Sequence, residues 1–255
     1  MTLEDLTQLC ASNTDKNKAN YIQAEWALNP SLVGTRLFDV PLLGVASADD
    51  PLFTEYKNPE VIGPHSMLPT DWLKEAKTVL SVFLPFTKEV RISNRSKGDP
   101  SAAWMHGRYE GQMYVEELCT VLAEFLHAAG EQAIVPILDP RFRNMQYVER
   151  GTFTSNWSER HVAYAAGLGT FGISKVLITE RGTAGRIGSV VTTLQLPPTM
   201  RSYSDPYEYC IFCMACEKRC EAEAISKEGK RNPPCKHLLL SVEKRHSPRS
   251  GCGKC

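Results

Sequence analysis

The sequence predicts an α+β fold with a layered, α/β-type core, followed by a small cysteine-rich domain. Apolar runs typical of buried strands alternate with helical segments through most of the chain. Seven of the nine cysteines lie between Cys210 and Cys255. With 255 residues, of which 42% are hydrophobic, the chain is long enough to bury a large core. We therefore predict one domain over residues 1–200 and a second over residues 201–255.

The first part of the larger domain is predicted to contain two helical segments and two strands. Residues Leu3–Leu28 have a helical pattern with a break near its middle, and Phe38–Ala46 is rich in β-forming residues. Asp71–Lys77 has the pattern of a helix end, with Thr70 as its N-cap. Thr78–Phe86 is a continuous apolar run, which predicts a strand buried on both faces.

The next part alternates loops with regular elements. Lys88–Pro100 is polar and predicts a loop, whereas Gly111–Ala129 has apolar residues at three- and four-residue intervals and predicts an amphipathic helix. Gln132–Leu138 is predicted to be a second buried strand. Asp139–Asn156 is predicted to be a long loop, and loops of that length in a compact domain are usually functional.

The last part of the larger domain is predicted to contain a short helix and a hairpin. Ser158 is expected to cap a helix over Glu159–Ala166. Lys175–Thr179 and Ile187–Leu196 flank a glycine-containing turn, which is typical of a β-hairpin. Two prolines follow, and they mark the expected boundary to the cysteine-rich domain.

The charge balance and the N-terminus exclude several classes of protein. The 29 Lys and Arg residues are matched by 29 Asp and Glu residues, so a generally basic surface for non-specific nucleic-acid binding is excluded. The longest apolar runs are far shorter than the ~20 residues of a membrane helix. The N-terminus lacks a basic region followed by an apolar stretch, so no signal peptide is expected. We expect a cytoplasmic protein with no membrane partner.

The cysteine spacing predicts iron–sulfur binding. Cys210–Cys220 reads C-x2-C-x2-C-x3-C, the bacterial ferredoxin run for a [4Fe–4S] cluster, in which the fourth cysteine binds the other cluster of a pair. Zinc also accepts four thiolates and is the alternative, although it usually uses two separated C-x2-C pairs. A disulfide framework suits short secreted chains and does not suit this one.

The remaining cysteines complete a second group. We define the first cysteine set as Cys210, Cys213 and Cys216, and the second cysteine set as Cys220, Cys235, Cys252 and Cys255. The second set has the four thiolates that a cluster needs. The first set has three, so its fourth ligand is expected to be a non-cysteine group, an open iron position or a residue beyond the last one given. Two clusters this close in sequence predict electron transfer.

Basic residues are frequent around these cysteines: Lys218, Arg219, Lys227, Lys230, Arg231, Lys236, Lys244, Arg245, His246 and Arg249. They have two interpretations. They compensate the negative charge of thiolate-bound clusters on a solvated face, or they form a docking surface for an acidic electron donor or a tRNA backbone.

Two segments of the larger domain carry a family resemblance. Asn156–Thr179 contains an ER…A…AGLG…G…LIT stretch, and Gly185–Leu196 follows with a Gly-Ser strand. Together with the cysteine array they resemble the core of epoxyqueuosine reductases and of their relatives, the corrinoid reductive dehalogenases. Leu73–Phe86 is similar to the helix–strand entry of these families. The resemblance covers roughly residues 70–255.

The resemblance implies a nitroreductase-like core that binds cobalamin, and a ferredoxin-like domain with two [4Fe–4S] clusters that pass electrons to the cobalt. Three glycines, Gly167, Gly169 and Gly172, lack side chains, so the backbone there is expected to approach a large flat cofactor closely. A helix cap and a turn are the alternative explanations for the first two. The other expected cofactor-binding residues are Gly107, Ala166, Leu168 and Ser189.

The expected catalytic residues lie just before the long predicted helix. Epoxyqueuosine reductases have a Gly-x-Asp-Tyr motif there, whose aspartate donates a proton. This chain has Tyr109 in the place of that aspartate, which is more similar to reductive dehalogenases, whose proposed donor is a tyrosine. Arg108 and Glu110 flank it as candidate catalytic residues. The Lys-Asn pair that usually follows the second glycine of the loop is Ile173–Ser174 here.

The sequence therefore favours a cobalamin-dependent iron–sulfur reductase. Its substrate is expected to be organohalide-like or epoxyqueuosine-like in tRNA, and its electron donor a ferredoxin or a flavodoxin. Two alternatives are a non-enzymatic two-cluster electron carrier and a protein that carries or reduces a corrinoid for another enzyme. Bound corrin would distinguish the electron carrier from the other two, and substrate turnover would distinguish the reductase from the corrinoid carrier.

Overall fold

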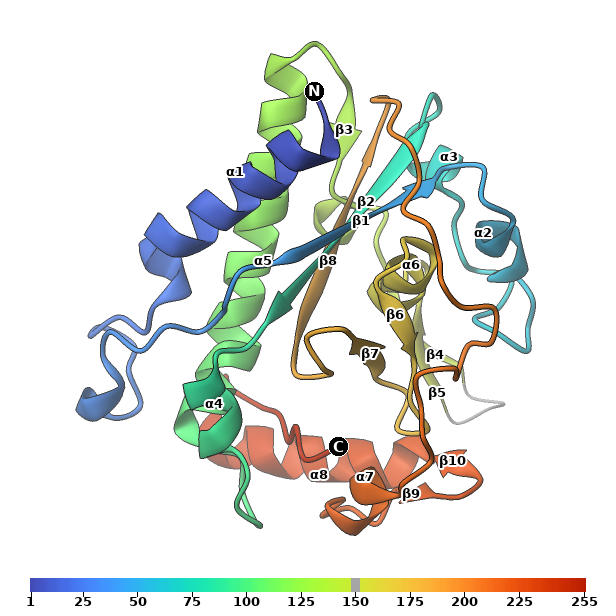
Figure 1. Cartoon of the computed structure of the whole chain (residues 1–255). Helices are drawn as coiled ribbons and strands as arrows, with labels where there is room; N and C mark the ends of the chain where they lie inside the picture. The colour runs from blue at the N-terminus through green and yellow to red at the C-terminus, as the bar shows by residue number, and fades with distance from the viewer. Residues whose placement is uncertain (148–151) are drawn as a thin grey trace.

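A four-stranded antiparallel sheet forms the centre of the protein (Figure 1). The computed structural model describes residues 1–147 and 152–255. The strand order is β1-β2-β8-β3. The strands are β1 (Leu42–Ser47), β2 (Thr78–Pro85), β8 (Gly185–Thr192) and β3 (Ala133–Ile134).

Helices cover both faces of this sheet (Figure 1). Side chains alternate across β8, so that Val190 packs in the cluster beneath α5, whereas Val191 packs in the cluster beneath α6. The long helix α5 (Ala102–Ala128) and α1 (Leu3–Lys16) lie on one face. The other face carries α6 (Glu159–Ala165), with α2 (Pro51–Glu55) and α3 (Pro69–Trp72) beside it. Because both faces are covered, all eight residues of β2 are buried, as predicted.

The long helix begins nine residues before the predicted start at Gly111, because Ser101 caps it. The Ser101 hydroxyl accepts a hydrogen bond from the Trp104 backbone N–H at 3.1 Å. Gly107 and Gly111 lie inside the helix, where a Cβ would come within 2.6 Å of the Phe86 ring and 2.8 Å of the Phe38 ring, respectively. These glycines therefore allow close packing of the helix and do not mark its end.

The predicted hairpin between residues 175 and 196 is wrong. The strand β7 (Leu177–Thr179) pairs with β6 (Gly169–Phe171), and β8 pairs instead with β2 and β3. The turn between the two segments is present, but the second segment enters the central sheet, where its apolar residues are buried on both faces. Burial in that sheet outweighs the local pairing that the turn favours.

Two predicted loops contain regular structure. Lys88–Pro100 begins with α4 (Lys88–Ser93), which Thr87 caps. The long predicted loop contains the paired strands β4 (Asn144–Tyr147) and β5 (Thr152–Ser155), and its middle, 148–151, lies outside the described residues. Of the predicted strand Gln132–Leu138, only β3 is extended. Its remainder forms a 3-10 turn, since Pro136 cannot donate to the sheet.

The helix α3 begins one residue before the predicted cap at Thr70, with Leu68 in the N-cap position. Ser158 does occupy the N-cap position of α6, but its hydroxyl pairs with Nδ1 of His161 at 2.8 Å. The short 3-10 turns are η1 (Lys18–Asn20), η2 (Pro30–Leu32) and η3 (Pro136–Leu138).

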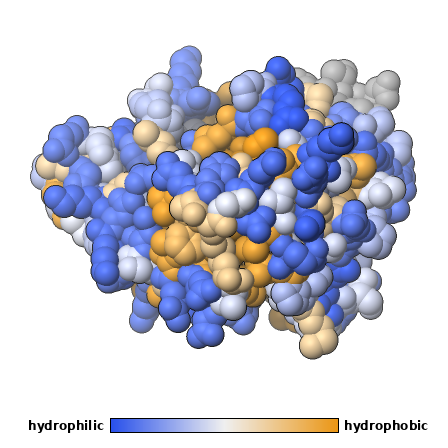
Figure 2. All heavy atoms as spheres, turned by 90° about the horizontal axis from the view of Figure 1, so that it is seen from above, coloured by the Kyte–Doolittle hydropathy of each residue, from blue (hydrophilic) through white to orange (hydrophobic). Residues whose placement is uncertain are grey.

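The cysteine-rich segment lies at one end of the sheet, beyond α5 and β7 (Figure 1). It contains α7 (Ala215–Lys218), β9 (Ile225–Ser226), β10 (Gly229–Lys230) and α8 (Asn232–His246). Seen from the opposite end, apolar side chains reach the surface in the middle and hydrophilic ones surround them (Figure 2). Among the described residues, no helix is long and apolar enough to cross a membrane.

Candidate functional site

The loop of the first cysteine set contains two residues in the left-handed backbone conformation. Phe212 (φ 50°) and Met214 (φ 58°) are left-handed, which is uncommon for residues with side chains. Left-handed residues in such a turn direct successive N–H groups toward a common point, as in many iron–sulfur sites. Cys213 is exposed, and Cys210 and Cys216 are half-buried. This loop therefore fits a negatively charged cluster held by thiolates.

The second cysteine set comes from three separate parts of the chain, and its members influence one another electrostatically. Cys220 follows α7, Cys235 lies on α8, and Cys252 and Cys255 lie in the C-terminal segment. Burial raises the pKa of Cys255, and the neighbouring Cys235 and Cys220 thiols raise it further. Burial likewise raises the pKa of Cys252, with contributions from Cys255 and Cys235. The four thiols thus form one electrostatic group.

The two cysteine sets adjoin each other. Burial raises the pKa of Cys216, and both Cys255 and Cys210 raise it further. The backbone N–H of Ala224 lies 3.3 Å from the Cys220 sulfur, a contact of the kind that tunes cluster potentials. In the described part of the chain, no three His, Cys, Asp or Glu side chains form a site for a single metal ion. The donor chemistry, thiols with a backbone N–H directed at the Cys220 sulfur, fits clusters.

The C-terminal C-x2-C segment is anchored on the core. Gly253 (φ 65°) lies against Trp104 on α5, and a Cβ would overlap the indole ring. The Asn94 side chain donates to the Cys252 carbonyl oxygen at 2.8 Å. Lys254 is 2% exposed. Its ammonium group donates to the carbonyl oxygens of Asn94 (3.1 Å) and Ser96 (2.6 Å). Lys254 thus satisfies backbone carbonyl groups of the loop after α4, and this anchors the segment that contains Cys252 and Cys255.

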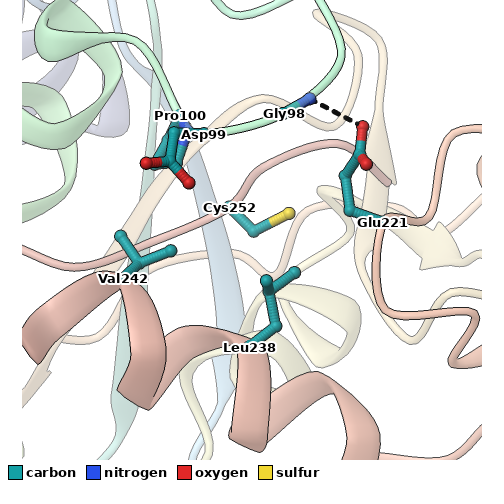
Figure 3. Close-up of a pocket in the computed structure, with 7 residues that line it drawn as sticks. All are labelled: Gly98, Asp99, Pro100, Glu221, Leu238, Val242 and Cys252. Carbon is teal, nitrogen blue, oxygen red and sulfur yellow. Dashed lines mark hydrogen bonds between the residues drawn. The ribbon is translucent and has the colours of Figure 1, made fainter. Parts of the chain in front are cut away.

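A cavity of about 150 Å³ lies beside Cys252 (Figure 3). The Cys252 side chain projects between the loop after α4 and α8 (Figure 3). Glu221, next to Cys220, accepts a hydrogen bond from the Gly98 backbone N–H at 3.0 Å. The lining residues are Gly98, Asp99, Pro100, Glu221, Leu238, Val242 and Cys252. The cavity therefore belongs to the site of the second cysteine set.

The candidate catalytic residues lie on α5, within the helix rather than before it. Nε2 of His106 accepts from the Leu28 backbone N–H at 3.0 Å, so its Nδ1 carries the proton and donates to Glu110 at 3.0 Å. Arg249 also donates to both oxygens of the Glu110 carboxylate. Glu110 is therefore occupied as the centre of an ion-pair network that joins α5 to the C-terminal segment.

Tyr109 is 39% exposed, and the Arg249 guanidinium carbon lies 5.9 Å from the centre of its ring. Arg108 extends toward α8. Burial lowers the pKa of Arg108, and Glu243 and Cys235 partly offset this effect. Three successive residues thus have different surroundings: Arg108 lies beside the second cysteine set, Tyr109 remains accessible, and Glu110 is paired. Their roles in catalysis stay predictions.

The glycines of the predicted cofactor loop are explained by contacts within the protein. A Cβ on Gly169 (φ 154°) would overlap the Ile178 carbonyl oxygen, and a Cβ on Gly167 (φ 80°) would come within 3.0 Å of Thr199. At Gly172 the nearest atom is 3.3 Å away, on Ile178. Contacts within the protein thus account for Gly167 and Gly169, and the approach of a cofactor to these positions stays a prediction.

The other predicted cofactor-binding residues are also packed in the core. Ala166 and Leu168 are buried, and Gly107 packs against Phe86 as described above. Ser189 is fully buried and accepts a hydrogen bond from the Trp157 indole N–H at 2.9 Å. Their contribution to cofactor binding stays a prediction, with packing as the role that the structure shows.

Sequence reasoning missed three charged residues on core elements near the site: Glu159, Arg160 and Arg186. Arg186, on β8, has a buried Nε with no hydrogen-bond partner among the described residues. Burial lowers its pKa to about 10, and the nearby Arg108 and Arg160 lower it further. Glu159 has two buried oxygens that also lack partners within the described ranges, and burial raises its pKa to about 8. Glu159 and Arg160 form the ER pair of the family stretch, and Arg186 follows Gly185. Sequence spacing alone does not show where their side chains point.

The arginines of this region are a candidate site for an anionic ligand. Nη2 of Arg186 donates to the Gln112 side-chain oxygen, whereas its Nε has no partner among the described residues. Arg108 on α5 and Arg160 on α6 lower the pKa of Arg186 on β8 as like charges, and like charges close together are unfavourable without an anion. The residues present therefore suit a cofactor with anionic groups, and cobalamin has a phosphate.

Comparison with known proteins finds partial similarity to proteins named as reductases. No protein-family model matches the chain. A 68-residue stretch is 40% identical to tetrachloroethene reductive dehalogenases of Desulfitobacterium hafniense and Dehalobacter restrictus, and it covers 26% of this chain and 12% of those proteins. The chain therefore matches only a small part of these relatives.

Solved structures extend the likeness to most of the chain. The epoxyqueuosine reductase of Streptococcus thermophilus has a TM-score of 0.50 and 16% identity, over 95% of this chain and 58% of that chain. A catabolic reductive dehalogenase in complex with 3-bromo-4-hydroxybenzoic acid has a TM-score of 0.48 and 15% identity, over 73% of this chain and 23% of that chain. The resemblance inferred from the sequence is confirmed, and the fold is similar to that of an epoxyqueuosine reductase.

Proposed function

We propose that this protein is a cobalamin-dependent iron–sulfur oxidoreductase with two [4Fe–4S] clusters. One observation carries the proposal: the segment that bears Cys252 and Cys255 is anchored by Asn94 and packs against Trp104 on α5, the helix that bears Tyr109. A structural metal site needs no such neighbour. The reductase names of the relatives and the similar fold support the same activity.

The chain's own residues have distinct tasks in this proposal. The two cysteine sets hold the clusters, and the anchoring by Lys254 and Asn94 fixes the C-terminal ligands against the core. Arg186 and its arginine neighbours would bind the anionic part of the corrinoid. A bound corrinoid supplies a cobalt centre that accepts electrons and delivers them to the substrate. Because Cys213 is exposed, the first cysteine set is accessible to an external donor of the ferredoxin or flavodoxin type.

Tyr109 is proposed as the proton donor to the reduced substrate, since its side chain is accessible and its neighbour Glu110 is occupied. Substituting Tyr109→Phe is expected to lower turnover about 100-fold, the lower end for loss of a general acid. Turnover of tetrachloroethene and of an epoxyqueuosine-bearing tRNA would be measured. Unchanged iron and cobalt contents are expected in the variant. Full activity of the loaded variant would contradict the assignment.

The metal content tests the whole proposal. Anaerobic reconstitution with iron, sulfide and cobalamin, followed by desalting, is expected to give about eight irons and one cobalt per chain. Cys235→Ser is expected to lose about half of the iron, because it removes one of four ligands of one cluster. Cys10→Ala is the control, since Cys10 is a buried residue of α1, away from both cysteine sets.

The alternatives give different results in the same experiment. Eight irons without cobalt would replace the reductase by a two-cluster electron carrier. Cobalt without turnover would favour a corrinoid carrier. Equal iron contents in the Cys235→Ser variant and the wild type would remove the second cysteine set from the proposal.

A further inference from the structure

The cavity beside Cys252 runs from the surface into the packed part of the cysteine-rich segment. Its rim contains the exposed residues Asp99 and Glu221, and its base contains Val242, which is 1% exposed. Leu238 and Val242 project from α8 toward Cys252 (Figure 3). A molecule in this cavity would therefore lie against the side chain of a proposed cluster ligand.

The walls of the cavity favour an uncharged molecule. The seven lining residues include no basic, amide or hydroxyl side chain. Both carboxylates in the wall already have partners: Glu221 accepts from the Gly98 backbone N–H at 3.0 Å, and Asp99 pairs with Arg245 at 2.5 Å. An ion entering the cavity would lose its hydration without gaining a new ion pair from the wall, which is unfavourable.

The size of the cavity suits a small apolar molecule. Its volume is about 150 Å³, and Pro100, Leu238 and Val242 supply apolar wall. An apolar cavity of this size can stay free of water and bind benzene or xenon. Dioxygen is smaller than either of these, is uncharged and prefers apolar surroundings to water. The cavity therefore has room for dioxygen in contact with Cys252.

We propose that this cavity admits dioxygen to the cluster of the second cysteine set. The inference rests on the proposed two-cluster assignment. Dioxygen takes one electron from the [4Fe–4S]²⁺ cluster and leaves as superoxide, and the oxidised cluster releases one Fe²⁺ and becomes [3Fe–4S]⁺. The residues around the cavity thus set how fast this cluster is lost in air, independently of the exposed loop of the first set.

The test follows iron loss from the reconstituted full chain after transfer into air-saturated buffer, with electron paramagnetic resonance to detect [3Fe–4S]⁺. The cluster of the first set is expected to be lost in a fast phase, since Cys213 is exposed, and the other cluster in a slow phase. Val242→Phe fills the cavity and is expected to slow only the slow phase, about tenfold, because access then requires a local opening of the fold. Leu240→Phe is the matched control, since Leu240 lies on the same helix and is 51% exposed.

A second pair of variants decides the test if Val242→Phe takes up less iron than the wild type. Leu238→Ala enlarges the cavity, and it is expected to accelerate the slow phase relative to Leu240→Ala, which removes the same atoms from an exposed position. Equal slow phases in these two variants would overturn the inference. A Val242→Phe variant that binds full iron and loses it at the wild-type rate would also overturn it.

Failure of the proposed function gives a different result. If the wild-type chain binds no cluster at the second set, that assignment fails, and the cavity is tested on the cluster-free chain with iodoacetamide, a small uncharged reagent that alkylates thiols. Alkylation of Cys252, read by peptide mass spectrometry, is expected to be slower in Val242→Phe than in the wild type. Cys235 does not line the cavity and should react equally in both. Equal rates at Cys252 would overturn the cavity as an access route.

Discussion

Replacing Glu110 by alanine is expected to lower the free energy of unfolding by about 3–5 kcal/mol, the usual cost of removing one partner of a buried ion pair. The carboxylate receives hydrogen bonds from His106 and Arg249, and its side chain is 9% exposed. Without it, the Arg249 charge stays in the interior with only the Trp26 carbonyl oxygen, 2.8 Å away, as an acceptor. The C-terminal segment would then lose a main contact with α5.

Urea unfolding of the reconstituted chain would measure this effect. Glu124→Ala is the matched control, because Glu124 is exposed on the same helix. The free energy of unfolding of the Glu124→Ala variant is expected to stay within about 0.5 kcal/mol of the wild-type value. A Glu110→Ala variant as stable as the Glu124→Ala variant would show that the network does not stabilise the fold.

The stability that this ion-pair network contributes is expected to be lost at acid pH. Burial raises the pKa of Glu110, but the hydrogen bonds from His106 and Arg249 outweigh it, so the pKa lies below its ordinary value. The stability that Glu110 contributes is therefore fully present above the unfolded pKa of about 4.3 and is lost as the pH falls through the folded value. The difference in stability between the wild type and Glu110→Ala should shrink over that range.

Replacing Gly253 by alanine is expected to remove the cluster of the second cysteine set and about half of the bound iron. The new Cβ would overlap the Trp104 ring, and the backbone there has φ 65°, which disfavours any side chain. The indole packs against Phe86, with ring centres 4.8 Å apart, so it cannot move aside freely. The segment with Cys252 and Cys255 would have to leave its place.

Gly229→Ala is the matched control for this substitution. Gly229 is also in the cysteine-rich segment and has φ 113°, but a Cβ there meets nothing within 4 Å. Both variants have backbone strain, and only Gly253→Ala has the steric overlap. Iron contents would be measured after identical reconstitution. Equal iron in the two variants would mean that contact with Trp104 is not needed to hold the cluster.

Local patterns were sufficient for several features. The cysteine spacing from Cys210 to Cys220 was enough to predict iron–sulfur binding, because thiols separated by two residues can reach the same cluster. The all-apolar strand β2 and the apolar stripe of α5 could be read from periodicity, since side-chain direction repeats within a strand or helix. The family stretch from residue 156 also led to the fold that the comparisons confirm.

Other features depended on packing between distant segments. The partner of β7 was predicted wrongly, because the turn before β8 is compatible with two pairings and burial selects one. The contacts of the glycines at 167 and 169 with Thr199 and Ile178 could not be predicted, because these partners lie elsewhere in the sequence. The early start of α5 followed from a cap that the glycines in its first turns had obscured.

The sequence by itself predicted the cysteines as metal ligands and located β2 and the apolar stripe of α5, because these properties depend on spacing along a few residues. Only the tertiary structure decided what surrounds them. Arg249 meets Glu110 and Lys254 meets Asn94 across long stretches of chain, and no local pattern encodes such contacts. Burial and charge pairing depend on the packing of α5, α6 and the C-terminal segment, and these interactions give the candidate site its electrostatics.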